Sequence, residues 1–279
     1  MPDIAYVNGR FGSLADAVVS IEDRGFQFGD GVYEVIRTYR GQPFAIEEHL
    51  VRLERSAQAL QLAIGQTRAQ WSSLIREGLR LSQFPEAKIY LQITRGQAPR
   101  DHPFPVSSAP TTVLTFRELH PLDVSVRNAG VQAMSIEDIR WGRCDIKSVN
   151  LLANVLARQR AKEAGVFEAI LVREGTVTEG SVSNVMVVRN GAVQTAPEGR
   201  RILSGVTRAI VLDLARKEGI PVAESFVTRE ELLAASEVFL TGTTVEVLPV
   251  VRVDGHAIGG GSPGPVSQLL SRRFEALVG

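Results

Sequence analysis

The amino-acid sequence predicts a two-domain α+β protein, and three observations support this class. The chain has 279 residues, which is enough for one large domain or two of ordinary size. Helical and strand-like patterns of apolar residues occur in both halves. Between the halves, the stretch after Pro121 has weak periodicity and a turn signal at 128–130. We therefore expect three parts, an N-terminal α/β domain over residues 1–120, a linker over 121–133 and a larger C-terminal domain over 134–279.

The N-terminal part is predicted to be a sheet with two helices. Asn8-Gly9 indicates a hairpin, because this dipeptide tolerates the positive φ of a tight turn. Apolar residues recur at helical spacing in two segments, and other segments are rich in β-branched and aromatic residues. The expected strands lie within 32–46, where two strands meet at Gly41, and at 88–96 and 111–119, and the expected helices are 47–62 and 67–82.

The C-terminal part is predicted to be a meander of strands with helices around it. Asn190-Gly191 and Asp254-Gly255 are hairpin signals. Thr228 with Glu231 has the spacing of a capping box at a helix start. The expected strands are 131–136, 167–172, 176–180, 183–188, 192–196 and 237–241, and the expected helices are about 150–164, 205–219, 228–235 and 265–277.

Charge and composition exclude several broad classes of protein. The 31 basic and 31 acidic residues give a formal net charge of zero, which argues against a general binder of nucleic acid or of anionic membranes. The first residues lack the basic and apolar regions of a signal peptide, and no apolar run approaches the ~18 residues of a membrane span. The single cysteine, Cys144, excludes an internal disulfide and a multi-cysteine metal site. We expect a cytoplasmic enzyme or binding protein.

Only four of the basic residues are lysines, and one of them is unusually placed. Lys162 and Lys217 lie in the last turns of predicted helices, where cations complement the helix dipole. Lys88 opens a predicted strand and is most simply a surface charge. Lys147 stands just before a predicted helix start, where the positive end of the dipole disfavours an ammonium. From position alone, a surface residue and a functional amine are equally good interpretations of Lys147, because lysine is rarely buried.

The sequence lacks the common catalytic motifs, and two polar segments stand out instead. HExxH and GxxxxGK[ST] are absent, the Gly-rich run 259–264 is interpreted as a flexible connector, and the histidines share no metal-ligand spacing, so no metal site is expected. Glu179 lies between two predicted strands, and taken alone it is most simply an exposed turn acid. Ser204, Gly205 and Thr207 surround a predicted helix start, which suits a phosphate. Ordinary capping by Ser204 explains these residues equally well.

Six short motifs follow one another along nearly the whole chain. They are DRGFQFGDGVYEV (23–35), EEHLVRL (47–53), ITRGQAPRDHPFP (93–105), EDIRWGRCDIKSVNLL (137–152), TVTEGSVSN (176–184) and LSGVTR (203–208). Together they resemble the fold-type IV pyridoxal-phosphate-dependent transaminases, and within them the D-amino-acid transaminases. The resemblance implies an α+β enzyme with a smaller N-terminal α/β domain, a larger C-terminal domain around a β-barrel-like sheet, and the cofactor between the two domains.

The resemblance also assigns residues to the cofactor, pyridoxal 5'-phosphate. Lys147 matches the lysine that binds the cofactor covalently and moves the α-proton, and apolar surroundings and nearby cations favour the neutral amine that this chemistry needs. Glu179 matches the acid that pairs with the ring nitrogen. The phosphate is met by Arg52, by the backbone amides of Val206 and Thr207 and by the hydroxyls of Thr207 and Thr243, while Ser183, Asn184 and Leu203 complete the cofactor site. Taken alone, Arg52 is most simply a helix-surface residue, because Glu48 stands at i−4 as an ion-pair partner.

A D-amino acid and a 2-oxo acid are the implied substrates. Tyr33, Arg100 and His102 match a trio that traps the substrate α-carboxylate, and an arginine fork with two further donors suits that group. In the family this loop reaches the active site of the neighbouring subunit, which implies a homodimer, although taken alone the loop is most simply solvated. Branched-chain relatives typically carry Gly-Gly-Asn-Tyr soon after the lysine, where this chain has Ser-Val-Asn-Leu over 148–151. This departure favours the D-amino-acid branch.

The expected activity is transfer of the amino group of a D-alanine-like donor to 2-oxoglutarate in a ping-pong cycle. An (R)-amine transaminase, a branched-chain amino-acid transaminase and an aminodeoxychorismate lyase of the same fold are the alternatives within the family. The lyase shares the cofactor residues, but Arg100 and His102 give it no advantage. A non-catalytic protein of this fold is disfavoured by the intact Lys147, Glu179 and Arg52.

Overall fold

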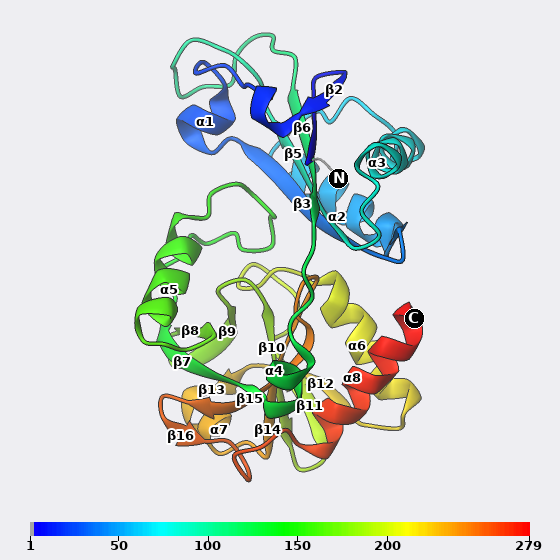
Figure 1. Ribbon diagram of the computed structural model, residues 1–279. Coiled ribbons are helices and arrows are strands. Elements are labelled where there is room, and N and C mark those ends of the chain that lie inside the picture. The colour runs from blue at the N-terminus through cyan, green and yellow to red at the C-terminus, as the bar shows by residue number, and fades with distance from the viewer. Residues whose placement is uncertain (1–2) are drawn as a thin grey trace. The chain divides into compact units, whose positions relative to one another are not determined.

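The computed structural model describes residues 3–279, which form two compact units (Figure 1). One unit contains the residues up to His120 together with Ile146–Asn150. The other contains Pro121–Asp145 and Leu151–Gly279. The segment Ile146–Asn150 thus belongs with the N-terminal unit, although the chain on both sides of it belongs to the second unit.

The N-terminal unit is built on a six-stranded sheet of order β2-β1-β6-β5-β3-β4. Neighbouring strands of this sheet are antiparallel. The long pairing of β3 with β5 aligns Tyr33 with Gln92, while β4 pairs only with the far end of β3, at Thr38 and Tyr39. The strands are β1 (Ile4–Val7), β2 (Arg10–Ser13), β3 (Gly31–Tyr39), β4 (Gln42–Pro43), β5 (Ala87–Thr94) and β6 (Thr111–Glu118).

Two helices, α2 (Ile46–Ala59) and α3 (Arg68–Ser82), cover this sheet and form its core, as their apolar spacing predicts. At Gly78 a Cβ atom would lie 2.0 Å from the Phe116 ring, so glycine lets α3 approach β6 closely. The remaining helices are the single-turn η1 (Leu14–Asp16) and α1 (Arg24–Phe28), whose N-terminus is capped by Asp23. The core includes Ile36, Leu50, Leu53, Trp71, Ile75, Ile89, Leu91, Leu114 and Phe116.

The second unit contains a ten-stranded, curled sheet of order β12-β11-β10-β14-β15-β7-β8-β9-β13, with β16 paired to β15 (Figure 1). Three pairs are parallel, namely β15 with β7, β7 with β8 and β11 with β12. The strands are β7 (Val131–Glu137), β8 (Glu168–Arg173), β9 (Thr176–Gly180), β10 (Asn184–Arg189), β11 (Ala192–Thr195), β12 (Val222–Glu224), β13 (Val227–Thr228), β14 (Glu237–Gly242), β15 (Glu246–Val253) and β16 (His256–Ala257). This mixed α+β architecture with a barrel-like sheet confirms the predicted fold class.

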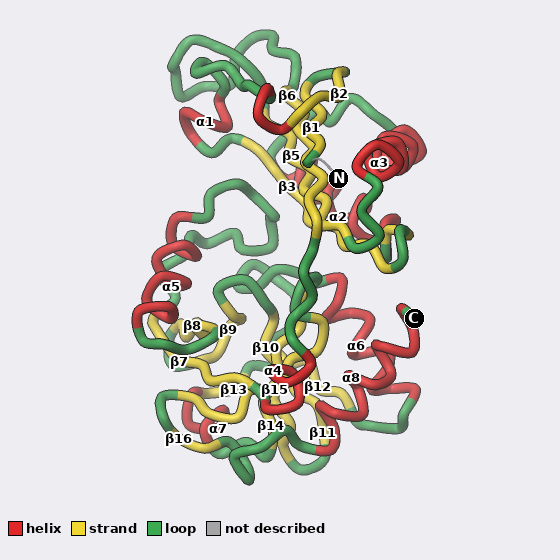
Figure 2. The backbone as a smooth tube through the Cα atoms, in the orientation of Figure 1, coloured by secondary structure: helices red, strands yellow, loops and turns green. Residues whose placement is uncertain are grey.

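Five helices belong to the second unit. They are α4 (Val124–Ala129), α5 (Leu152–Glu163), α6 (Val206–Lys217), α7 (Arg229–Leu233) and α8 (Pro265–Val278). The capping box predicted from Thr228 and Glu231 is present at the start of α7. The stretch 121–133, expected as a linker, contains α4 and the first residues of β7. Figure 2 shows that the chain from the end of β7 to the start of α5 is a loop, and this loop carries Lys147.

No helix within residues 3–279 is both long and apolar enough to cross a membrane.

Candidate active site

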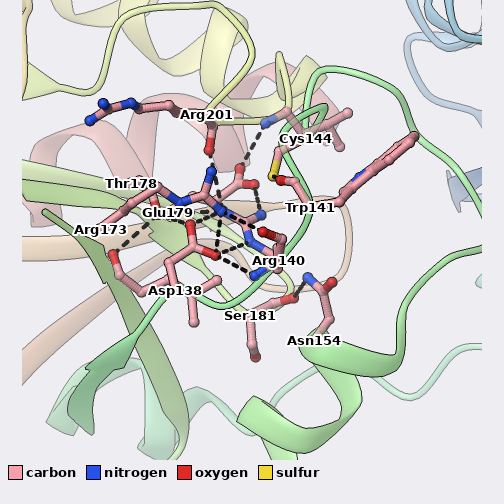
Figure 3. Close-up of polar contacts among 12 residues, drawn as sticks. Asp138, Arg140, Trp141, Cys144, Asn154, Arg173, Thr178, Glu179, Ser181 and Arg201 are labelled. Carbon is pink, nitrogen blue, oxygen red and sulfur yellow. Dashed lines mark hydrogen bonds and ion pairs between the residues drawn. The ribbon is translucent and has the colours of Figure 1, made fainter.

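Glu179 lies in β9 of the second unit and is buried, with only 5% of its surface exposed. Its interpretation as an exposed turn acid is therefore wrong. Three groups donate hydrogen bonds to its carboxylate. They are Nη1 of Arg140, Nδ2 of Asn184 at 3.0 Å and the backbone N–H of Leu203 at 3.0 Å. Figure 3 shows the contact with Arg140. All three partners are donors, so the arrangement suits the ionised carboxylate. The structure thus brings together Glu179, Asn184 and Leu203, three of the predicted site residues.

Burial and charge act on Glu179 in opposite directions. Burial raises the pKa of Glu179 above its ordinary value, while the guanidinium of Arg140 and the N–H of Leu203 oppose that rise. Asp138, a second carboxylate in the same cluster, adds to the rise. The cation of Arg140 is therefore the main group in the second unit that favours the ionised form of Glu179.

The start of α6 lies close to Asn184. The residue before this helix, Gly205, adopts an extended conformation, and no side chain caps the helix. The N-cap residue of α6 is therefore Gly205, and Ser204 is the residue before it. A Cβ atom at Gly205 would lie 2.0 Å from Oδ1 of Asn184, so only glycine fits there. Val206 and Thr207, both predicted to meet a phosphate, form the buried first turn, where backbone N–H groups and the dipole favour an anion.

Two turns of the second unit lie side by side near this helix start. A Cβ atom at Gly242, next to Thr243, would lie 3.7 Å from the carbonyl oxygen of Val182 and 3.9 Å from Cβ of Ser183. The Ser183 hydroxyl itself donates to Glu168 at 2.9 Å, so its polar atom is engaged inside the unit. Thr243 is half-buried. The turn that carries Thr243 thus lies against the turn that carries Ser183, whose hydroxyl is already engaged.

Lys147 is held against β3 in the N-terminal unit. Its backbone N–H donates to Oγ of Ser56 at 3.2 Å, and its carbonyl accepts from the N–H of Tyr33 at 3.0 Å. The neighbouring Ser148 forms a β-bridge with Val32. The lysine Nζ lies 4.1 Å from the centroid of the Tyr33 ring, a cation–π geometry. The structure therefore joins Lys147 with Tyr33, the residue predicted to bind substrate.

Arg52 is buried and forms a charged cluster with Glu34 and His49. Its Nε and Nη2 donate to the two carboxylate oxygens of Glu34 at 2.7 and 2.8 Å, and Nδ1 of His49 lies 2.8 Å from the same carboxylate. The interpretation of Arg52 as a helix-surface residue is therefore wrong. Burial favours the protonated form of Glu34, but the guanidinium beside it holds the pKa of Glu34 well below its usual range. Burial lowers the pKa of His49, so His49 is neutral at pH 7 and Glu34 is a carboxylate that fixes Arg52.

Arg100 and His102 lie at the surface of the N-terminal unit, on a loop whose backbone is held by a buried arginine. Buried Arg24 donates to the carbonyl oxygens of Asp101 at 2.6 Å and His102 at 3.1 Å. The Arg100 guanidinium lies 4.6 Å from the centroid of the Phe28 ring, and the His102 ring lies 5.5 Å from it. The loop is exposed, as its composition suggests, but its backbone is fixed. Within the chain Arg100 and His102 lie together, whereas Tyr33 lies beside Lys147.

Sequence reasoning missed several residues of these clusters, among them Glu34, His49 and Arg140. These three lie within motifs that supported the resemblance, so the motifs marked the right segments. Each of the three has a partner far away along the chain, as for Arg140 and Glu179, which are 39 residues apart, although Arg140 also pairs with Asp138 two positions away. Among the described residues, no group of three histidine, cysteine or acidic side chains could hold a metal ion.

The residues present fit pyridoxal phosphate chemically. A buried carboxylate with three donors has lone pairs left for a protonated ring nitrogen. An uncapped helix start suits a phosphate. Lys147 supplies an amine beside an aromatic ring. Each unit holds part of this set, with Lys147 and Arg52 in the N-terminal unit and Glu179 and the start of α6 in the second.

Comparisons with known proteins agree with this chemistry. A family model described as amino-transferase class IV matches residues 31–253. The chain is 46% identical over 269 residues to a D-alanine aminotransferase of Bacillus licheniformis, covering 96% of this chain and 94% of the relative. It is 41% identical over 271 residues to a D-alanine aminotransferase of Listeria monocytogenes, covering 96% and 93%.

Solved structures give the same assignment. The branched-chain amino acid aminotransferase of Escherichia coli superposes with a TM-score of 0.93 at 28% identity, covering 100% of this chain and 95% of that one. A branched-chain enzyme from T.th., solved with pyridoxamine 5'-phosphate, superposes with a TM-score of 0.90 at 30% identity, covering 99% and 93%. The chain belongs to the class IV aminotransferases.

Proposed function

We propose that this protein is a pyridoxal-phosphate-dependent D-amino-acid aminotransferase that moves the amino group of a D-alanine-like donor to 2-oxoglutarate. The observation that carries the proposal is the similarity over nearly the whole chain to enzymes named D-alanine aminotransferase. The solved branched-chain enzymes share the fold at lower identity. This chain also departs from the branched-chain pattern at 148–151, which favours the D-amino-acid reaction.

When bound, pyridoxal phosphate supplies a carbonyl group that takes up the amino group and a ring that accepts electrons released at the α-carbon. Lys147 holds this group covalently and carries the α-proton. Glu179 keeps the ring nitrogen protonated. Arg52, the first turn of α6 and Thr243 hold the phosphate. Support for these roles comes from the buried carboxylate of Glu179, the buried cation of Arg52 and the uncapped helix start.

The substrate α-carboxylate is bound by Arg100, His102 and Tyr33 in this proposal. The trap works across a homodimer, with the loop of one subunit completing the site of the other. Support comes from the loop itself, whose backbone is fixed by Arg24 while Arg100 and His102 remain exposed. Apolar side chains beside it are exposed in the single chain, including Phe26 at 76% and Phe104 at 54%. Such exposed apolar side chains are typical of a surface that pairs with another subunit.

Arg100→Ala is expected to raise KM for D-alanine and for 2-oxoglutarate together, because both substrates present a carboxylate to the same guanidinium. Loss of a charged hydrogen bond corresponds to about a 10–100-fold loss in kcat/KM. Turnover of (R)-1-phenylethylamine, which has no carboxylate, should be spared. Steady-state kinetics with the three substrates measures this pattern, and Arg117→Ala, which removes an exposed arginine of the same unit, serves as the control. Parental kinetics with D-alanine would remove Arg100 from the trap.

Mixing two variants that are both impaired with D-alanine tests whether the trap crosses the subunit boundary. Lys147→Ala and Arg100→Ala subunits, co-refolded in equal amounts, form mixed dimers in which one site has both an intact lysine and an intact arginine. Random pairing restores about a quarter of the parental activity, since half of the dimers are mixed and each has one complete site. Activity no higher than the sum of the two separate variants would place Arg100 in its own subunit's site.

A further inference from the structure

We propose that Arg140 is a positioning residue that keeps Glu179 ionised and thereby sets the acid limit of the reaction. The proposal rests on the role proposed above for Glu179. Sequence reasoning assigned no role to Arg140. The structure places this side chain, 7% exposed, at the centre of the buried polar cluster that Figure 3 shows.

The Arg140 guanidinium is fixed by contacts that leave one nitrogen for Glu179. Nε and Nη2 donate to the two carboxylate oxygens of Asp138 at 2.9 and 2.8 Å. Nη2 also donates to the carbonyl oxygen of Arg201 at 3.2 Å and lies 3.3 Å from the Thr178 hydroxyl. Nη1 is directed to Glu179. A planar guanidinium group that is held in this way on one side directs its remaining N–H groups in a defined direction.

Asp138, which holds the fork, is itself firmly placed. Arg173 donates to it at 3.0 Å, and the Thr178 hydroxyl donates to it at 2.9 Å. Arg173 also donates to the carbonyl oxygen of Arg140 at 2.9 Å. Although burial opposes the shift, hydrogen bonds and the Arg140 charge lower the pKa of Asp138 to about 2. Asp138 is thus an anion throughout the working pH range, and it orients Arg140 without sharing a proton with Glu179.

The charges around Glu179 show why Arg140 matters to it. Asp138 and the thiol of Cys144 both interact with Glu179, and the Asp138 carboxylate repels a second carboxylate. Arg173 contacts Asp138, whereas Arg140 contacts both acids. Without Arg140, Glu179 would be a buried carboxyl beside an anion, and such a group holds its proton to higher pH. A protonated Glu179 is a poorer acceptor for a ring N–H.

Arg140→Gln tests the proposal, because glutamine retains hydrogen bonding to both acids but removes the charge. Removing an opposite charge in contact with an acid raises its pKa by about 1–3 units. The acid limb of kcat/KM for D-alanine should therefore move to higher pH by about that amount, while Arg140→Lys should stay close to the parent. Arg173→Gln is the matched control, since this arginine shares Asp138 and does not contact Glu179, and its acid limb should not move.

The cofactor-free protein provides a second readout. A folded-state pKa raised above the unfolded value means that Glu179 binds a proton in the native state only, so stability falls as pH rises through that interval. In Arg140→Gln the apparent Tm should therefore fall further below the parent at pH 8 than at pH 6. The double variant Arg140→Gln/Glu179→Gln should lose this pH dependence, which identifies Glu179 as its source.

The outcomes separate this proposal from the proposed function. Suppose that Arg140→Gln leaves the acid limb of kcat/KM unmoved and that its Tm difference from the parent does not depend on pH, while Glu179→Gln is strongly impaired. This result would overturn the role of Arg140 and leave that of Glu179 intact. Parental turnover of Glu179→Gln would overturn the role of Glu179 itself. An equal shift of the acid limb in Arg173→Gln would also contradict the proposal, because it would show that any loss of charge in the cluster suffices.

Discussion

Replacing Lys147 by alanine is expected to abolish the visible absorption of bound pyridoxal phosphate and nearly all aminotransferase turnover. No other amine is available in the same place, since the chain has only three further lysines. Lys162 lies in the last turn of α5, and Lys217 pairs with Asp213 at the surface. Loss of a positioned proton-transfer group alone costs about 10²–10⁴ in rate, and loss of the covalent attachment adds to it.

Absorption spectra of the purified variant with added cofactor, together with coupled turnover assays, measure this effect. Lys88→Ala is the matched control, because Lys88 lies in β5 of the same unit and has no proposed role. It should keep both the absorption and the activity. A Lys147→Ala protein that retained the absorption of covalently bound cofactor would show that another lysine holds the cofactor, and would contradict the assignment of Lys147.

Glu179→Gln is expected to fold and to bind the cofactor, yet to transaminate about 10²–10³-fold more slowly, which corresponds to about 3–4 kcal/mol in the barrier. Glutamine has nearly the same shape, and its single oxygen can still accept either from Arg140 or from Leu203 and Asn184, which contact different carboxylate oxygens of Glu179. It lacks the negative charge that keeps a proton on the ring nitrogen, so the ring accepts electrons less readily.

Glu174→Gln provides the control for this substitution. Glu174 lies in the turn before β9 and pairs with Arg201 at the surface, 72% of its side chain being exposed. Glu174 is an exposed turn acid, which is how Glu179 is interpreted from its sequence neighbours alone. Replacing Glu174 should leave turnover unchanged. Single-turnover kinetics and cofactor titration distinguish slower chemistry from weaker binding. Turnover of Glu179→Gln within twofold of the parent would show that its charge has no part in the reaction.

Much of the secondary structure could be predicted because it follows from local patterns. The apolar spacing of α2 and α3 and the capping box at Thr228 act within a few residues, and the structure has them as expected. The stretch 121–133 has weak periodicity, yet it folds into α4 and the start of β7 because β15 pairs with β7. Strand pairing of this kind depends on residues more than a hundred positions away, which no local pattern records.

In the candidate site, too, local patterns fail where a residue's partner lies far away along the chain. Local reasoning made Arg52 a surface residue because Glu48 is four positions away, but the helix turns this side chain toward Glu34 of β3. Local reasoning interpreted Glu179 as a turn acid because no cation is close in sequence, although Arg140 donates a hydrogen bond to it in the folded chain. Only the family motifs singled out both residues, with Arg52 assigned to the cofactor phosphate and Glu179 to the ring nitrogen, and the structure has each of them in a buried charged cluster. Their partners, including Arg140, could be identified only once the strands were placed.

The central claim is that the protein transfers amino groups from D-amino acids, and a donor comparison tests it most directly. Purified protein with pyridoxal phosphate and 2-oxoglutarate is given D-alanine, L-alanine or L-leucine, and the product glutamate is resolved by chiral chromatography. The account predicts that D-alanine yields pyruvate together with D-glutamate, and that both L-amino acids react far more slowly. Faster conversion of L-leucine than of D-alanine, with L-glutamate as the product, would contradict the account and identify a branched-chain enzyme.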